Sequence, residues 1–312
     1  MARGGRTRMI VESAAVLAAL LAGSWLLFRL TVYRGAAAAA LAQARDEARA
    51  DEAIVVAVGG DVVRISPSGG TSVLAVGQRL RADDSVRTGR GGRTDLVVGS
   101  RSRLTITETT QLTVREITEK VHRFKLTRGR IAVDYQADGA RMLRIESGDG
   151  AAVAETQGAR FGVLSTGTAV AIATETGAVN LTSQSRTVKV RAGTQAVAIA
   201  GGPPSSAESI PARLLLKVAV AAPARDRDEN LCAAVEGTAP AGSEVLVDGA
   251  PAAIADDGRF QVRVPAAPDK ATVLVAIRDA SGRETTRPVR CGSSGSIPHI
   301  KDFAIRWRRK GR

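Results

Sequence analysis

The sequence predicts an all-β protein that is carried on one N-terminal transmembrane helix. Three observations lead to this class. From Ile54 to Ala200, short runs alternate apolar and polar residues with a period of two, and glycine-containing turns separate the runs. A second series of such runs follows a segment rich in Pro, Gly and Ser. Near the N-terminus, one apolar run is long enough to cross a bilayer.

The apolar run "MIVESAAVLAALLAGSWLLF" contains a single charged residue, Glu12. A helix of about 20 residues spans the roughly 30 Å hydrocarbon core, so we expect a transmembrane helix over residues 9–30. The basic start "MARGGRTR" favours residues 1–8 as a cytoplasmic stub, with the bulk of the chain on the other side of the membrane. A cleaved signal peptide is the alternative, although Arg29 and Arg34 lie between the apolar run and the nearest small-residue sites.

Residues 31–53 contain "RGAAAAALAQARDEARADEA", which is composed mostly of strong helix formers. The segment has no leucine or isoleucine stripe, so a packed coiled coil is not indicated. We expect a solvated helical stalk that separates the membrane from the next domain, and a disordered linker is the alternative.

The first β domain is expected over residues 54–200. Its runs include "DVVRIS", "TDLVV", "RLTITET", "QLTVREI", "HRFKLT", "RIAVDY" and "MLRIES". In the third run, Leu104 and Ile106 should face one side of a sheet while Arg103 and Thr105 face the other. Many short strands at close spacing favour a sandwich, roll or barrel.

A linker is expected over residues 201–212, and a second β domain over residues 213–292. About seven runs in about 80 residues, separated by turns such as "APAG" and "DASG", are typical of an immunoglobulin-like sandwich. Cys232 lies in an early run and Cys291 closes the last one. A disulfide between them would suit an oxidising compartment, and two free buried cysteines are the alternative.

The stretch "VGQRLRADDSVRTGRGGRTDLVVGSRSRLTI" resembles the start of the FecR periplasmic domain, whose pattern is "G..L..GD.I.TG..S...L...GS...L". Later segments, "FKLTRGRIAV" and "VAETQGARFGVLSTGTAVAI" among them, follow the family pattern in order, and the resemblance covers about Ile54 to Ala200. In two places the chain departs from the pattern: Ala82-Asp83-Asp84 replaces the usual Gly-Asp, and no Asp precedes Gly99. The structural positions that the resemblance implies are Gly77, Leu80, Asp84, Val86, Thr88, Gly89, Gly99 and Ser100.

This resemblance implies a non-enzymatic protein of the inner membrane that acts by binding in envelope sensing and signal transduction. Known family members contact an outer-membrane transporter from the periplasm and control a sigma factor through a cytoplasmic domain. Residues 1–8 are too few to fold against a sigma factor, so another chain would carry any cytoplasmic output. The expected partner is an envelope protein, and an envelope structural module that binds peptidoglycan or another cell-wall polymer is the alternative.

The second β domain also resembles bacterial Ig-like domains, whose layout is "G.....G..V.V.G......DG.F...V". The matching positions in this chain are Gly237, Gly242, Val245, Val247, Gly249, Gly258 and Phe260.

No arrangement of residues indicates catalysis, a cofactor or a metal. A phosphate-binding reading of "TGRGGRT" requires a helix after the glycines, but the β run "TDLVV" follows. Asp83 and Asp84 are adjacent, so in extended backbone their side chains would point apart, and a structural turn is favoured over a carboxylate pair or a metal site. His122 and His299 show no spacing to a nucleophile, and no CxxC or HExxH occurs. We therefore expect no small-molecule substrate.

The formal net charge is +13, concentrated at the two ends of the chain, and aromatic residues make up only 3%. Platforms for stacking nucleic-acid bases are therefore not expected, and we predict no nucleic-acid partner. Residues 293–312 form a basic C-terminal tail that includes Arg306, Trp307, Arg308, Arg309 and Lys310. The tail is expected either to be a solvated terminus or to contact an anionic surface with Trp307 at the interface.

Overall fold

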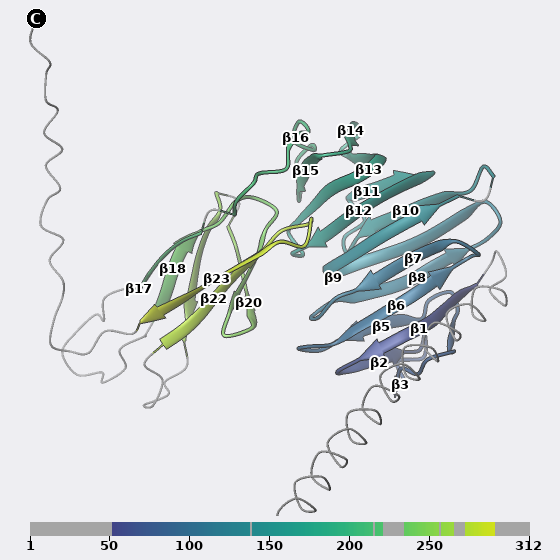
Figure 1. Cartoon of the computed structure of the whole chain (residues 1–312), viewed down its shortest axis with the longest axis horizontal. Coiled ribbons are helices and arrows are strands. Elements are labelled where there is room, and N and C mark those ends of the chain that lie inside the picture. The colour runs from purple at the N-terminus through teal and green to yellow at the C-terminus, as the bar shows by residue number, and fades with distance from the viewer. Residues whose placement is uncertain are drawn as a thin grey trace, which may run out of the picture.

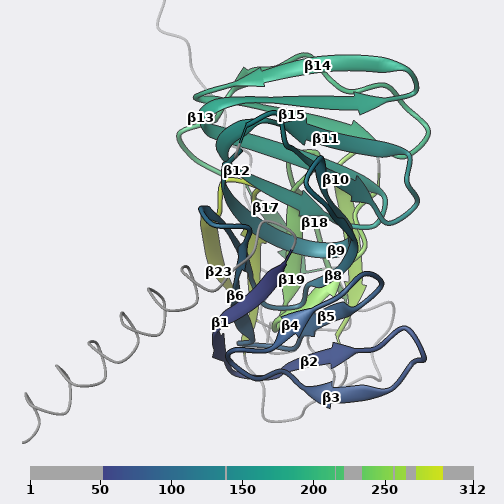
Figure 2. The same cartoon turned by 90° about the vertical axis from the view of Figure 1, so that its right-hand side faces the viewer.

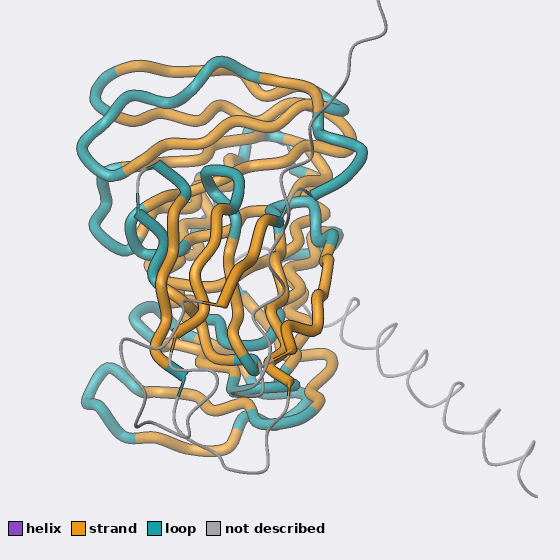
Figure 3. Tube along the Cα trace, turned by 90° about the vertical axis from the view of Figure 1, so that its left-hand side faces the viewer, coloured by secondary structure: helices purple, strands orange, loops and turns teal. Residues whose placement is uncertain are grey.

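The computed structural model describes residues 52–137, 139–214, 216–220, 234–255, 257–264 and 272–290. The predicted cytoplasmic stub, transmembrane helix, cysteines and basic tail lie outside these residues, as does the stalk except for its last two positions. All regular elements in the described ranges are strands, and Figure 3 shows these ranges as strand and loop. No helix long and apolar enough to cross a membrane occurs in this part of the chain. The all-β prediction is confirmed for it.

The N-terminal unit, residues 52–210, contains sixteen strands. They are β1 (Ala53–Gly59), β2 (Val62–Ile65), β3 (Thr71–Val73), β4 (Arg79–Leu80), β5 (Ser85–Thr88), β6 (Arg93–Val98), β7 (Ser102–Ile106), β8 (Gln111–Ile117), β9 (Val121–Gln136), β10 (Met142–Ser147), β11 (Ala152–Thr156), β12 (Gly158–Ser165), β13 (Ala169–Ser183), β14 (Arg186–Arg191), β15 (Thr194–Ile199) and β16 (Glu208–Ser209).

These strands form two layers that share their two longest members (Figures 1 and 2). One layer has the order β4-β1-β6-β7-β9-β12-β13-β15-β16, and the other has the order β3-β2-β5-β8-β9-β10-β11-β13-β14. The first half of β9 pairs with β8 and β10 in the second layer, and its second half pairs with β7 and β12 in the first layer. β13 crosses between the layers in the opposite direction.

Each long strand has a glycine with positive φ where it changes layer. These glycines are Gly129 in β9, at φ 91°, and Gly177 in β13, at φ 77°. A glycine adopts this backbone without steric cost, so the strand can bend without ending. We predicted "HRFKLT" and "RIAVDY" as separate runs, but they are the two halves of one 16-residue strand, because Gly129 bends the chain instead of reversing it.

The core of the N-terminal unit lies between the two layers. Its largest fully buried side chains include Phe124 and Tyr135, one from each half of β9. The alternation predicted for the third run is confirmed, because Leu104 and Ile106 are both completely buried in this core. Outward-facing residues on the same strands are mostly polar, as expected for a sheet with one solvated face.

The segment expected as a linker, residues 201–212, runs back along the N-terminal unit. β16 pairs with β15, and the backbone N–H of Ile210 donates to the carbonyl of Gly193 at 3.0 Å. The side chain of Ile210 packs against a small apolar cluster on the outside of the first layer. This segment therefore contributes to the surface that meets the second unit.

The C-terminal unit, residues 216–290, has seven described strands in two sheets around one apolar core (Figure 1). One sheet has the order β17 (Lys217–Val220), β18 (Ala234–Thr238), β21 (Arg259–Arg263), and the other has the order β20 (Ala250–Ala252), β19 (Glu244–Val247), β22 (Thr272–Arg278), β23 (Glu284–Arg290). The core residues Val235, Val245 and Val275 are completely buried.

Candidate functional site: the surface between the two units

Asp84 lies in the turn between β4 and β5 and is completely buried. One carboxylate oxygen accepts a hydrogen bond from the Arg64 guanidinium at 2.9 Å, and the other accepts the backbone N–H of Arg81 at 2.8 Å. The neighbouring Asp83 has φ 66°, a left-handed conformation that Asp tolerates, and its carboxylate pairs with Arg115 on the surface. The two carboxylates thus point to different partners, and Asp84 holds a turn.

The glycine-rich stretch after β5 is also a turn, and β6 rather than a helix follows it. The Thr88 hydroxyl donates to the carbonyl of Thr107 at 2.6 Å and accepts the N–H of Thr110 at 2.8 Å. The N–H of Gly89 donates to the carbonyl of Asp61 at 2.8 Å, and a side chain on Gly89 would overlap the Asp61 carboxylate. This stretch is therefore held to neighbouring turns by the Thr88 hydroxyl and by a backbone hydrogen bond of Gly89.

The remaining pattern positions lie in the core or in separate turns. Leu80 and Val86 are buried. Gly77 and Gly99 have positive φ, and Ser100 follows Gly99 as a half-buried residue. The positions thus occupy structural places along β4 to β7 and do not converge on one pocket.

His122 is buried in β9 and meets Tyr135 edge to face, with the ring centroids 5.8 Å apart. Both rings lie in the apolar core, as a packing role requires. Within the described ranges, no group of three or more His, Cys, Asp or Glu residues is arranged to hold a metal ion.

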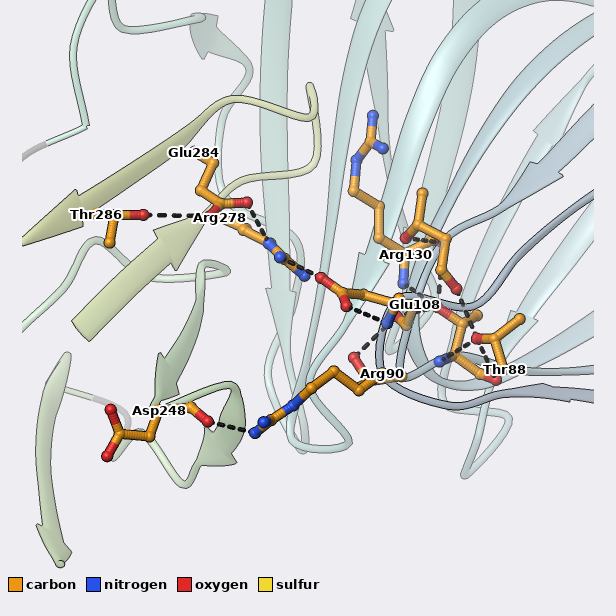
Figure 4. Close-up of polar contacts among 12 residues, drawn as sticks. Thr88, Arg90, Glu108, Arg130, Asp248, Arg278, Glu284 and Thr286 are labelled. Carbon is orange, nitrogen blue, oxygen red and sulfur yellow. Dashed lines mark hydrogen bonds and ion pairs between the residues drawn. The ribbon is translucent and has the colours of Figure 1, made fainter. Parts of the chain in front are cut away.

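A polar cluster joins the two units (Figure 4). At its centre is Arg278, at the end of β22. Its guanidinium donates both to Glu108, in the turn between β7 and β8, and to Glu284 of β23, the latter at 2.6 Å. Glu108 also accepts the backbone N–H of Gly91 at 2.7 Å. One arginine of the C-terminal unit is thereby connected to two turns of the N-terminal unit.

In the opposite direction, two arginines of the N-terminal unit donate to backbone carbonyls of the C-terminal unit. Arg90 donates to the carbonyl of Asp248, in the turn between β19 and β20 (Figure 4). Arg130 of β9 donates to the carbonyl of Ala280 at 3.1 Å. Burial lowers the pKa of the Arg130 guanidinium, although the charges of Asp279 and Glu175 oppose this shift.

The turn between β22 and β23 rests on a flat strip of small residues. Gly162 of β12 lies between Ala132 and Ala173 in the sheet, and a side chain at Gly162 would overlap the carbonyl of Ala280. Ala280 itself is 2% exposed in a cluster with Ala173. Asp279 shapes this turn by accepting the backbone N–H and guanidinium of Arg283. The small size of these residues, and the missing side chain at Gly162, allow the turn to approach the sheet closely.

A second apolar contact lies further along the same side. An added Cβ on Gly242 would lie 2.8 Å from side-chain atoms of Ala171 and Val197. We define the interdomain surface as Arg90, Glu108, Arg130, Gly162, Ala171 and Val197 on one side, and Gly242, Asp248, Ala280, Arg278 and Glu284 on the other.

Two glutamates near Arg278 have pKa values shifted in opposite directions. Burial acts to raise the pKa of Glu108, but the hydrogen bond from Gly91 and the hydrogen bond and charge of Arg278 outweigh it, so its pKa is lowered. Glu244 at the start of β19 is 6% exposed, and burial raises its pKa despite the charges of Arg278 and Arg128.

We predict opposite effects when each glutamate is replaced by glutamine at neutral pH. The ionised Glu108 stabilises the fold above the ordinary carboxyl pKa, and this contribution disappears as pH falls through its lowered value, so Glu108→Gln should cost about 0.5 kcal/mol at pH 7 and less in acid. Burial disfavours the ionised form of Glu244, so Glu244→Gln should stabilise by about 1 kcal/mol at pH 7. Urea unfolding at pH 7 and at acidic pH measures both. Equal losses of stability would contradict the assigned environments.

We also predict that Gly162→Ala displaces the turn between β22 and β23. The added methyl group must push the Ala280 carbonyl away, because it would overlap both carbonyl atoms, while the nearest atom of any other residue, on Arg130, is 3.6 Å distant. Hydrogen exchange of Asp279 to Arg283 should accelerate while exchange of the buried core strands stays unchanged. Gly158→Ala on the same strand is the matched control, because an added Cβ there has no atom nearer than 3.9 Å. Unchanged protection of the turn from hydrogen exchange would show that the strip does not determine the position of the turn.

Sequence reasoning missed the interdomain surface. Arg90 and Glu108 lie in turns that look like ordinary solvated loops, and contacts such as Arg130 to Ala280 join residues 150 positions apart. The local signal is Gly162 itself, because a glycine inside a strand can mark a close approach of another backbone.

The family model described as "FecR protein" matches residues 84–180, from the end of the Asp84 turn through most of β13. A comparison with curated protein sequences finds no match. Two crystal structures of a proposed anti-sigma factor from Parabacteroides distasonis ATCC 8503, at 2.50 and 1.65 Å resolution, are similar in part. In both cases the sequence identity is 12% and the TM-score is 0.36, and the similarity covers 40% of this chain and 59% of the other. The family match identifies residues 84–180, within the N-terminal unit, as a FecR domain.

Proposed function

We propose that this chain is a single-pass protein of the inner membrane that takes part in envelope signal transduction by binding another protein. The match of residues 84–180 to the FecR family carries the proposal, because that family is regulatory and in general non-enzymatic. Residues 9–30 would cross the membrane, with the N-terminus in the cytoplasm and both β units in the periplasm.

The C-terminal unit would be an Ig-like domain that packs against the FecR domain. Its described strands form a three-stranded and a four-stranded sheet over one core, which supports this assignment. The interdomain surface would couple the two units, because Arg278 and the Ala280 turn of the C-terminal unit bind strands and turns of the FecR domain directly. A partner that contacts either unit would thus act on both.

In-cell cross-linking of the full-length chain tests this function. After detergent solubilisation and capture, mass spectrometry should find one recurrent envelope or regulatory protein in stoichiometric amount. Deleting the gene should change the expression of a defined set of genes. Capture of cell-wall fragments without a recurrent protein would favour the polymer-binding module instead and would overturn the signalling proposal.

A reporter fusion tests the topology. Alkaline phosphatase, which is active only in the periplasm, should be active when fused after residue 290 and inactive when fused after residue 8. The opposite pattern would contradict the proposed orientation.

A further inference from the structure

The strand β3 forms one open edge of the second layer. It pairs with β2 alone among the described strands, and Figure 2 shows it at one end of the stacked strands, with β14 at the other end. An open edge exposes backbone N–H and C=O groups, which another extended chain can pair with.

The register of the β2–β3 hairpin determines which backbone groups point outward. Leu74 donates to Val62, and Ser66 donates to Gly70, so these pairs are the hydrogen-bonded ones, and by alternation the pair of Arg64 with Ser72 is too. The backbone groups of Thr71 and Val73 therefore point away from β2. They can form up to about four hydrogen bonds with an added strand.

The outer face of the hairpin is apolar as well. Val73 is 81% exposed and lies directly opposite the half-buried Val63, while Thr71 lies opposite the half-buried Ile65. Val76, just after the strand, is 57% exposed. Residues 65–78 contain no charged side chain, in a protein with 24% charged residues. Both the backbone and the side chains of this edge thus suit an uncharged extended strand.

The opposite edge strand has the protection that β3 lacks. β14 carries Arg186, Lys189 and Arg191, all exposed, and charges on an edge strand oppose pairing with another chain. The two edge strands of this layer therefore differ in charge: β14 carries three basic residues, and β3 carries no charged residue.

A second copy of this chain is a poor occupant of the β3 edge. The strand has three residues, so a symmetric pairing would offer few hydrogen bonds to hold two chains that each carry a formal charge of +13. An acidic partner is attracted by the same charge and can supply the missing strand.

We propose that the β3 edge, defined as Thr71, Val73 and Val76, docks a short uncharged strand of an acidic envelope protein by extending the second layer. This inference rests on the proposed function and names the binding face for it. The contact is small, so the complex forms and dissociates readily, as a sensing interaction requires.

The test uses the full-length chain in cells, with a photo-cross-linking amino acid at position 76. Val73→Pro removes one outward N–H without removing a bond to β2, and should lower the yield of the partner cross-link about tenfold. Lys189→Pro is the matched control on the β14 edge, because the N–H of Ala192 donates to Gly177 and alternation turns the N–H of Lys189 outward. It should leave the yield unchanged, and the cross-linked peptide of the partner should map to an uncharged extended segment.

Three outcomes would overturn the docking proposal. An adduct of twice the chain mass would identify a second copy as the occupant. A partner that cross-links equally in Val73→Pro, or that cross-links only when the photo-cross-linking amino acid is moved to position 189, would place binding elsewhere and leave the proposed function intact. The absence of any protein partner, from position 76 and from the whole-chain cross-linking above, would overturn the docking proposal and the proposed function together.

Discussion

Replacing Asp84 with alanine should lower the free energy of unfolding of the FecR domain by about 3–5 kcal/mol. The substitution removes a fully buried carboxylate and leaves the partly buried Arg64 guanidinium without its counter-charge. It also leaves the backbone N–H of Arg81 without an acceptor inside the turn. Urea unfolding of the full-length chain, followed by hydrogen exchange of β2 and β5, measures this loss.

Asp83→Asn is the neighbouring control. The Asp83 side chain is 55% exposed, its pairing with Arg115 is on the surface, and asparagine tolerates the left-handed backbone. A loss of less than about 1 kcal/mol is therefore expected. If the two substitutions cost the same, the buried pair of Asp84 and Arg64 would not be what holds this turn.

Gly129→Ala should destabilise the FecR domain by about 3 kcal/mol or more. Its φ of 91° is unfavourable for any residue with a side chain, and an added Cβ would lie 2.5 Å from Thr110 Cα. Before this residue β9 pairs with the second layer, and after it β9 pairs with the first layer. Any shift at Gly129 therefore disturbs both layers. A large decrease in the thermal unfolding midpoint is the expected observation.

Gly167→Ala separates backbone strain from crowding. Gly167 has nearly the same φ, 94°, but no atom lies within 4 Å of an added Cβ. Alanine there should cost only about 1 kcal/mol. Similar losses at the two positions would mean that the backbone angle, rather than the close approach of Thr110, accounts for the requirement at Gly129.

The strand pattern was predictable because it is local. Alternation at Leu104 and Ile106 follows from the geometry of one strand, so the buried face is visible without knowing its neighbours. The FecR pattern was predictable for a related reason, since its glycines and Asp84 lie in tight turns whose backbone limits the choice of residue.

The path of β9 was not predictable in the same way. A glycine between two alternating runs is compatible with a hairpin turn or with a bent continuous strand, and the choice depends on which strands flank it. Here β12 accompanies the second half of β9 along its whole length, so the chain continues and changes layer.

The amino-acid sequence by itself determined the all-β class of the described residues and the FecR domain, because both depend on residues close together in the chain. Only the tertiary structure decided which groups meet between the two units. Two examples are the contacts of Gly162 with Ala280 and of Glu108 with Arg278. The residues of each pair are far apart in sequence, and nothing in the local sequence around either residue specifies its partner. The same reason applies to the β3 edge, because a strand is an edge only when no other strand of the folded protein lies beside it.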